Sequence, residues 1–348
     1  MKKIDFFTQS KVLIVAGKGG VGKTTVSAVL AYAVAMESKK ALLVEVEPKD
    51  DLLDIFELNT AVHSFGDTTT LEDKGTKHDS AALGYEETLL ALLPHGGQVV
   101  GRVLTADDAL VEYLANHGLK KVIKKLLASG VLDVVATAIP GIRDILVLGK
   151  IKQLERVQAA DSAGLIVVDA PGTGHVMTFL SSSSGLLDAA RGGPIRVQAQ
   201  EVVDMLDDPA RCQVILVTLP EEMPINETIE AAYFLEEKVG ITLGPVVVNC
   251  LYPVVKGLEP DPEQTALEVP TLATGTLAAL KEAADFRLKR QNLQEEQLKK
   301  LRAELPLPQI HLPQLFTREI ALKEIEFLGA VFRDQITHLS YDFADKLV

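Results

Sequence analysis

The chain has 348 residues, 47% of them hydrophobic and 24% charged, and its 35 Lys and Arg against 48 Asp and Glu give a formal net charge of −13. This apolar content excludes intrinsic disorder as a description of the whole chain. The acidic balance argues against a surface that attracts nucleic acid, which is not expected as a partner.

The first expected strand, Lys11–Ala16, is an apolar run that leads directly into Gly-Lys-Gly-Gly-Val-Gly-Lys-Thr-Thr. A helix with one apolar stripe is expected from Thr24 to Met36. Between them lies the GxxxxGK[ST] pattern of a P-loop, whose glycines let backbone N–H groups converge on phosphate oxygens at a helix N-terminus. The pattern predicts binding of ATP or ADP, with Lys23 at the β and γ phosphates and the Thr24 hydroxyl on Mg²⁺. The residues expected to bind the nucleotide here are Gly17, Gly19, Gly20, Val21, Gly22, Lys23, Thr24 and Thr25.

A long connection follows the second expected strand, Ala41–Val46. About 120 residues separate it from the next core strand, far more than a crossover through one helix needs. We therefore expect an insertion in this connection, of which the largely helical subdomain lies at approximately 95–160. Its expected parts are a polar stretch at 66–80, two short strands, Thr88–Leu93 and Gln98–Val103, and helices over 106–157.

The third core strand, Leu165–Asp169, ends in a carboxylate and enters the loop Ala-Pro-Gly-Thr-Gly-His. An acid at this place holds Mg²⁺ through water in P-loop proteins, which predicts that role for Asp169. The segment Gly172–His175 is expected to respond to the γ-phosphate as a switch. An acid at a strand end can also be an ordinary turn or helix cap. A second helical insertion is expected at approximately 180–210.

The remaining core strands are expected at Gln213–Thr218 and Pro245–Asn249, with helical patterns at Leu277–Leu305 and Ile320–Leu347. The alternation of strands and helices predicts an α/β fold. Because the strands are apolar almost throughout, we expect a doubly wound, mostly parallel sheet with helices on both faces, in one domain over 1–348.

Three segments resemble one family. GKGGVGKTT, the acid-x-acid-Pro segment at Glu45–Pro48 and DAPGTGHVMTFL are similar to the ArsA ATPases and to the ATPases that target tail-anchored membrane proteins, and further segments resemble the paired ArsA-like proteins of actinobacteria. The resemblance implies a P-loop ATPase with a deviant Walker A motif. In that class Lys18 reaches across a dimer interface to the partner's phosphates, which implies a homodimer or a heterodimer with a homologous ATPase.

The resemblance also implies roles for single residues. Glu45 falls where an acid lies near the metal, and Glu47 falls where an Asp positions the attacking water. Asn249 falls where an amide reads adenine, and the loop that contains Pro313 and Leu315 falls where the family closes over the base. Since an error of about 1 Å can cost on the order of 10² in rate, a Glu in place of Asp leaves slow hydrolysis as a second interpretation.

Both cysteines, Cys212 and Cys250, fall in or beside the predicted strands and lie far apart in the sequence. They provide neither the CxxC of a zinc-bridged dimer nor the clustered thiolates of an arsenite site, and neither zinc nor an iron–sulfur cluster is expected. The low cysteine count and the N-terminus, which has no signal-peptide pattern, favour a cytoplasmic location. No stretch approaches the ~18 apolar residues of a membrane span, so no transmembrane segment is expected.

The sequence thus predicts Mg²⁺-dependent hydrolysis of ATP to ADP and phosphate, with Lys18 and Lys23 neutralising phosphate charge and Glu47 orienting water. The resemblance adds movement of the helical subdomain and a client or membrane-protein partner. One alternative is a slow or non-hydrolysing switch or scaffold subunit that works with a homologous partner, and another is a small-molecule phosphotransferase. An arsenite-pump ATPase is less expected.

Overall fold

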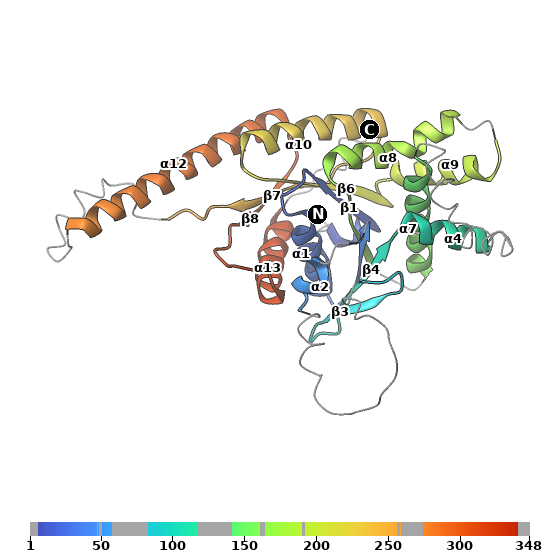
Figure 1. Cartoon of the computed structure of the whole chain (residues 1–348), viewed down its shortest axis with the longest axis horizontal. Helices are drawn as coiled ribbons and strands as arrows, with labels where there is room; N and C mark the ends of the chain where they lie inside the picture. The colour runs from blue at the N-terminus through green and yellow to red at the C-terminus, as the bar shows by residue number, and fades with distance from the viewer. Residues whose placement is uncertain are drawn as a thin grey trace, which may run out of the picture.

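The computed structural model describes residues 6–46, 48, 51–57, 83–116, 141–160, 164–189, 192–255, 258 and 274–339. Its strands form one sheet in the order β3-β4-β2-β5-β1-β6-β7-β8 (Figure 1). Neighbouring strands are parallel except for β3 and β4. The expected α/β fold with a mostly parallel sheet is therefore confirmed. The strands are β1 (Val12–Gly17), β2 (Lys40–Val46), β3 (Thr88–Leu92), β4 (Gln98–Leu104), β5 (Leu165–Asp169), β6 (Cys212–Thr218), β7 (Val246–Leu251) and β8 (Gln309–Pro313).

Helices cover both faces of the sheet, because side chains on both faces of its central strands are apolar. Along β1, Val12 and Ile14 join one buried cluster, whereas Leu13 and Val15 join the other. The second cluster contains α1 (Lys23–Ala35), α2 (Asp51–Ile55) and α13 (Leu322–His338). The first contains α7 (Ile142–Ala160), α8 (Thr173–Ala189), α9 (Pro194–Leu206), α10 (Glu222–Phe234) and α12 (Thr274–Glu304), and α4 (Ala106–Asn116) packs on α7.

The strands β3 and β4 correct the expected insertion. Both belong to the main sheet, where β4 pairs with β2 from Lys40↔Gln98 to Val46↔Leu104 and β3 is the antiparallel edge strand. Sequence spacing suggested that they lay in the subdomain, because the connection from β2 is too long for a simple crossover. In the described part of the chain, the helical segment therefore begins after β4, at Ala106. The segments 66–80 and 117–140 lie outside the described residues.

The segment that carries Pro313 is a strand at the far edge of the sheet, and not the loop that was expected. In β8, Ile310 and Leu312 are fully buried, while His311 and Pro313 are only partly buried. The strand pairs with β7 through Val247↔Ile310. Its five residues include a proline, so the alternating pattern of a strand is weak in the sequence.

The C-terminal helices follow the predicted pattern. The 31-residue α12 begins three residues before the expected start, and its N-terminal half extends away from the sheet (Figure 1). The helix α13 ends at His338 and packs on α1, where an added Cβ at Gly329 would lie 3.2 Å from Cδ1 of Tyr32. Residues 340–348, where the expected helix continued, lie outside the described residues. None of the helices described is both long and apolar enough to cross a membrane.

Candidate functional site

The P-loop joins the carboxyl end of β1 to the first turn of α1, as the sequence predicted. Gly17 packs so closely against β6 that an added Cβ would lie 2.4 Å from the carbonyl oxygen of Val217. Gly20 and Gly22 both have a φ of +86°, in the left-handed region that favours glycine. The loop therefore needs glycine at these three positions. Lys23 is 8% exposed, and its Nζ donates to the carbonyl oxygen of Lys18 at 3.2 Å.

A hydroxyl and a carboxylate meet at the start of α1. Asp169, the last residue of β5, is fully buried, and its Oδ2 accepts a hydrogen bond of 2.8 Å from Oγ1 of Thr24. Its Oδ1 accepts a 3.2 Å bond from the buried Ser27. Hydroxyl and carboxylate oxygens are the ligands that Mg²⁺ prefers, so Thr24 and Asp169 fit this cation. Within the described residues, no group of three or more His, Cys, Asp or Glu side chains could hold a metal ion.

Ser27 is a residue that sequence reasoning missed. It lies within the apolar stripe of α1, between Val26 and Ala28, and is fully buried. A serine among apolar helix positions indicates a buried hydrogen bond, and its spacing of three residues from Thr24 places both hydroxyls on one side of the helix. That signal was available in the sequence, but it did not identify the acceptor.

Of the two carboxylates expected at the end of β2, Glu45 and Glu47, the structure describes only Glu45. Glu45 is fully buried and lies directly opposite Asp169 in the β2–β5 register. This position places it close to the Thr24–Asp169 pair, and its role as an acid near the metal stays a prediction. Glu47, the expected water-positioning residue, lies outside the described residues.

Asn249 holds the P-loop in this structure. Its Nδ2 donates to the carbonyl oxygen of Val21 at 3.0 Å, and its Oδ1 accepts from the backbone N–H of Cys250 at 2.9 Å. The side chain is 6% exposed, and an added Cβ at Gly22 would lie 2.4 Å from its Nδ2. The amide thus links the carboxyl end of β7 to the loop after β1. A contact with adenine stays a prediction.

Lys18 forms an ion pair within its own chain. Its Nζ lies 2.5 Å from Oε1 of Glu227 on α10, and both side chains are about one third exposed. Sequence reasoning assigned Lys18 to a partner subunit's phosphates and did not identify Glu227. No sequence signal points to this carboxylate, because 209 residues separate the two partners and only the tertiary structure brings them together.

Two other predicted segments lie at the same edge of the sheet. An added Cβ at Gly172, in the expected switch, would lie 3.9 Å from the backbone nitrogen of Gly19, so the two loops are adjacent. Beyond Pro313, Leu315 is partly buried against the core cluster that contains α1 and α13. The closure of Pro313 and Leu315 over a base stays a prediction.

A cavity of about 780 Å³ opens beside Thr24 and Thr25. Its size is within the usual range of ~300–1,000 Å³ for ligand pockets. Four carboxylates contribute to its lining, and they disfavour a bare phosphate there. These residues are Asp51, Asp54, Glu57 and Glu319.

Burial raises the thiol pKa of both cysteines. Cys212 is fully buried in β6, and desolvation raises the pKa of its thiol, with smaller effects from nearby charges. Desolvation also raises the pKa of Cys250, with a smaller contribution from the charge of Glu221. Both thiols are therefore disfavoured as thiolates, the form that binds metals and metalloids.

The fold and the loop define a class. A mostly parallel α/β sheet with a glycine-rich loop between β1 and α1, and an acid at the end of the adjacent β5, is the arrangement of a P-loop nucleotide-binding protein. The matching family model is described as an anion-transporting ATPase family, ArsA, and covers residues 10–72.

Known proteins support the same assignment. Over 244 residues, 68% of this chain, the chain is 34% identical to the putative ATPase Mb3704 of Mycobacterium bovis and to the ATPase BagA of Mycobacterium tuberculosis. The aligned region spans 64% of the length of each of these relatives. A putative arsenical pump-driving ATPase of Halobacterium salinarum is 28% identical over 70% of this chain and 36% of its own length. The chain is an ArsA-like protein.

Proposed function

We propose that this protein binds ATP with Mg²⁺ and hydrolyses it to ADP and phosphate. The observation that carries the proposal is the hydrogen bond between Thr24 and Asp169. It lies directly after the P-loop, whose backbone requires glycine at three positions. These two oxygens are the ones that would hold the cation. The names of the mycobacterial relatives, which are called ATPases, support the same activity.

Different residues of the chain have different roles in the proposed reaction. The loop N–H groups and the N-terminus of α1 bind the phosphates, and Lys23 neutralises their charge. Bound Mg²⁺ would offset the negative charge on the β and γ phosphates, held by Thr24 and Asp169 with Glu45 nearby. Glu47 orients the attacking water, and Asn249 with the segment at Pro313 and Leu315 encloses the base.

The proposal includes a dimer. Lys18 leaves Glu227 and neutralises phosphate charge on a partner subunit, which is either a second copy or a homologous ATPase. The helical segments within 95–160 and 180–210 then change position with the nucleotide and bind a client or membrane protein. An arsenite pump is not proposed, because Cys212 is fully buried and its thiol pKa is raised.

Phosphate release by the purified protein tests the activity. We expect turnover that needs ATP and Mg²⁺ and that falls by at least ~10²-fold in Lys23→Ala and Asp169→Asn. Ser27→Ala is the matched control, since it removes only the second hydroxyl on Asp169, and should lose less than ~10-fold. Equal turnover in the parent and Lys23→Ala would refute the P-loop assignment.

The second candidate is a nucleotide-dependent switch that hydrolyses slowly or not at all. The ion pair of Lys18 with Glu227 favours it, because a lysine held in its own chain cannot neutralise a partner's phosphates. Quantification of nucleotide in the folded protein distinguishes the candidates. ATP that remains intact for hours with Mg²⁺ and a homologous partner supports the switch, and stoichiometric ADP supports the enzyme.

A further inference from the structure

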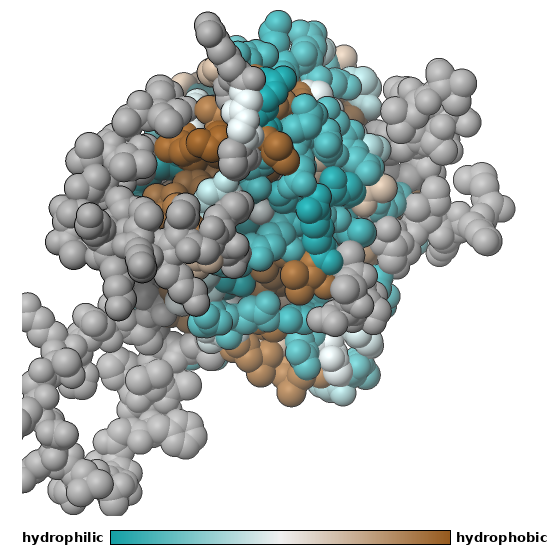
Figure 2. All heavy atoms as spheres, turned by 90° about the vertical axis from the view of Figure 1, so that its right-hand side faces the viewer, coloured by the Kyte–Doolittle hydropathy of each residue, from teal (hydrophilic) through white to brown (hydrophobic). Residues whose placement is uncertain are grey.

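A second cavity lies among the helices on the side of the molecule that carries α4, α7 and α9 (Figure 1). Its volume is about 190 Å³. Among the described residues, the charged side chains that line it are Lys150, Lys152 and Arg156 and one carboxylate, Glu112. None of these residues belongs to the candidate nucleotide site. Figure 2 shows this side of the molecule, where hydrophilic residues occupy much of the described surface between separate hydrophobic patches.

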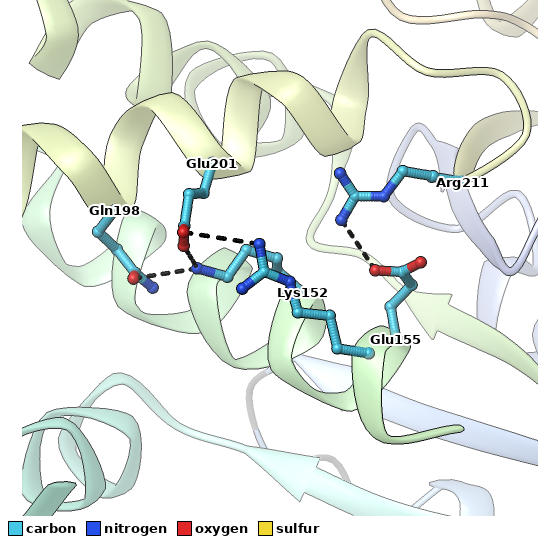
Figure 3. Close-up of polar contacts among 6 residues, drawn as sticks. Lys152, Glu155, Gln198, Glu201 and Arg211 are labelled. Atoms are coloured by element: carbon cyan, nitrogen blue, oxygen red, sulfur yellow. Dashed lines mark hydrogen bonds and ion pairs between the residues drawn. The ribbon is translucent and has the colours of Figure 1, made fainter. Parts of the chain in front are cut away.

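The most buried of the three cations is Lys152, whose side chain is 5% exposed. Its ammonium donates to Oε1 of Gln198 at 3.1 Å and to the carboxylate of Glu201, both of which project from α9 towards α7 (Figure 3). Arg156 lies 3.6 Å from the other oxygen of Glu201. One carboxylate is therefore shared by two cations.

Lys150 forms an ion pair with the other carboxylate, that of Glu112. Its Nζ lies 2.6 Å from Oε1 of Glu112, and the other carboxylate oxygen, Oε2, accepts a hydrogen bond from the Tyr85 hydroxyl. Burial alone would raise the pKa of Glu112, but the hydrogen bonds from Lys150 and Tyr85 outweigh it and leave the pKa lowered, so this group is ionised. Within the described part of the chain, these three cations share two carboxylates, which leaves an excess of positive charge around the cavity.

An amide adds a neutral donor to this set. Since Oε1 of Gln198 accepts from Lys152, its Nε2 is the end that can donate elsewhere. This nitrogen lies over Gly149 of α7, where an added Cβ would be only 1.9 Å away. Glycine at 149 is therefore what allows the amide to lie between the two helices. The cavity combines a donor amide with buried ammonium groups.

We propose that this cavity binds a small oxyanion, the phosphate or carboxylate group of a metabolite. Charge-assisted hydrogen bonds from ammonium, guanidinium and amide groups are the contacts that such anions take. The volume lies well below the ~300–1,000 Å³ of pockets for drug-sized ligands, which limits the ligand to a few heavy atoms. An anion here contacts α7 and α9 together and strengthens their packing.

Titration calorimetry with inorganic phosphate and with acetate tests the proposal, at a fixed ionic strength of about 0.15 M. The titrations use the full chain with Lys23→Ala, so that the P-loop does not contribute. We expect Gln198→Glu to weaken binding of the tighter anion at least tenfold, because a carboxylate replaces the donor. That carboxylate still accepts from Lys152, so the fold is retained, which thermal unfolding checks. Arg156→Ala, at a side chain that is 57% exposed, should weaken binding about threefold or more.

Matched controls lie far along the chain on exposed positions. Asn292→Asp repeats the amide-to-carboxylate change and Arg318→Ala repeats the loss of one cation, and neither should alter the affinity. If neither phosphate nor acetate binds, or if binding is the same in Gln198→Glu as in its parent, the cavity is only a structural ion-pair network and the proposal is wrong. Binding that is present with Lys23 and lost in Lys23→Ala assigns the anion to the P-loop and also overturns it.

Discussion

At the scale of the residue, single contacts determine what the candidate nucleotide site can do. The glycines of the loop are required by a backbone oxygen of β6 and by two left-handed φ values, not by the ligand alone. The side chain of Asn249 then fixes the carbonyl of Val21, which leaves the neighbouring N–H groups available for phosphate. A buried amide with both ends bonded is costly to remove, by about 1–3 kcal/mol.

Asn249→Ala separates two roles of this amide. If it holds the loop, the variant should lose at least ~10-fold in affinity for both ATP and tripolyphosphate, which carries no base. Fluorescence competition measures both ligands, and Asn292→Ala, at an exposed amide, is the control. Loss of ATP affinity with unchanged tripolyphosphate affinity would instead assign Asn249 to adenine.

Glu227→Gln tests the ion pair that holds Lys18. Because both side chains are about one third exposed, the pair contributes only about 0–1 kcal/mol. We therefore expect Mg·ATP-dependent dimerisation to strengthen by no more than about fivefold in this variant, as Lys18 is released. Analytical ultracentrifugation measures the dimer constant. Weaker dimerisation in Glu227→Gln would show that the pair orients Lys18 for the partner and does not restrain it.

At the scale of the element, α7 is attached to the sheet at the amino ends of β1 and β6, whereas the P-loop follows the carboxyl end of β1. Glu155, which is 3% exposed, contacts Lys11 before β1 at 3.2 Å. It also contacts Arg211 before β6 at 2.8 Å (Figure 3). Burial alone would raise the pKa of Glu155, but hydrogen bonds from Arg211 and Lys11 outweigh burial and lower it. Any movement of α7 relative to the sheet must therefore break this contact or turn about it.

Glu155→Gln should destabilise the protein by about 2 kcal/mol at pH 7. Because the folded-state pKa lies below the unfolded value, this stabilisation is fully present above the unfolded pKa of about 4.3 and is lost as the pH falls through the folded pKa. The difference between Glu155→Gln and the parent should therefore shrink as the pH falls below 4. Urea unfolding at a series of pH values measures it, with the exposed Glu296→Gln as control. A difference independent of pH would mean that packing, not charge, carries the effect.

At the scale of the whole molecule, the proposed function requires a chain with a net negative charge to bind ATP, which is itself a polyanion. The net charge of −13 and the four carboxylates around the larger cavity both oppose ATP. In the proposed complex, loop N–H groups, the N-terminus of α1, Lys23 and Mg²⁺ would reverse the field locally. The lysine next to them, Lys18, is the group that ties this site to a second subunit in the proposal.

Sedimentation of the whole chain tests that dimer. We expect a shift from monomer to dimer with Mg·ATP but not with Mg·ADP. In Lys18→Ala, ATP should still bind while turnover falls by about 10³-fold, the scale of an arginine finger given in trans. A dimer that is independent of nucleotide, or unchanged turnover in Lys18→Ala, would contradict the role of Lys18 across the interface.

The sequence by itself determined the parallel core strands, the P-loop and the acid at the end of β5. These features follow from local patterns, because apolar runs, glycine spacing and a terminal acid are each readable within a few residues. The sequence placed β3 and β4 in the insertion and β8 in a loop, because strand pairing depends on partners that are distant along the chain. Tertiary structure alone decided that Lys18 contacts Glu227, that Asn249 holds Val21, and that α7 and α9 enclose a cationic cavity. Each of these contacts joins residues separated by tens to hundreds of positions, where no local pattern records the neighbour.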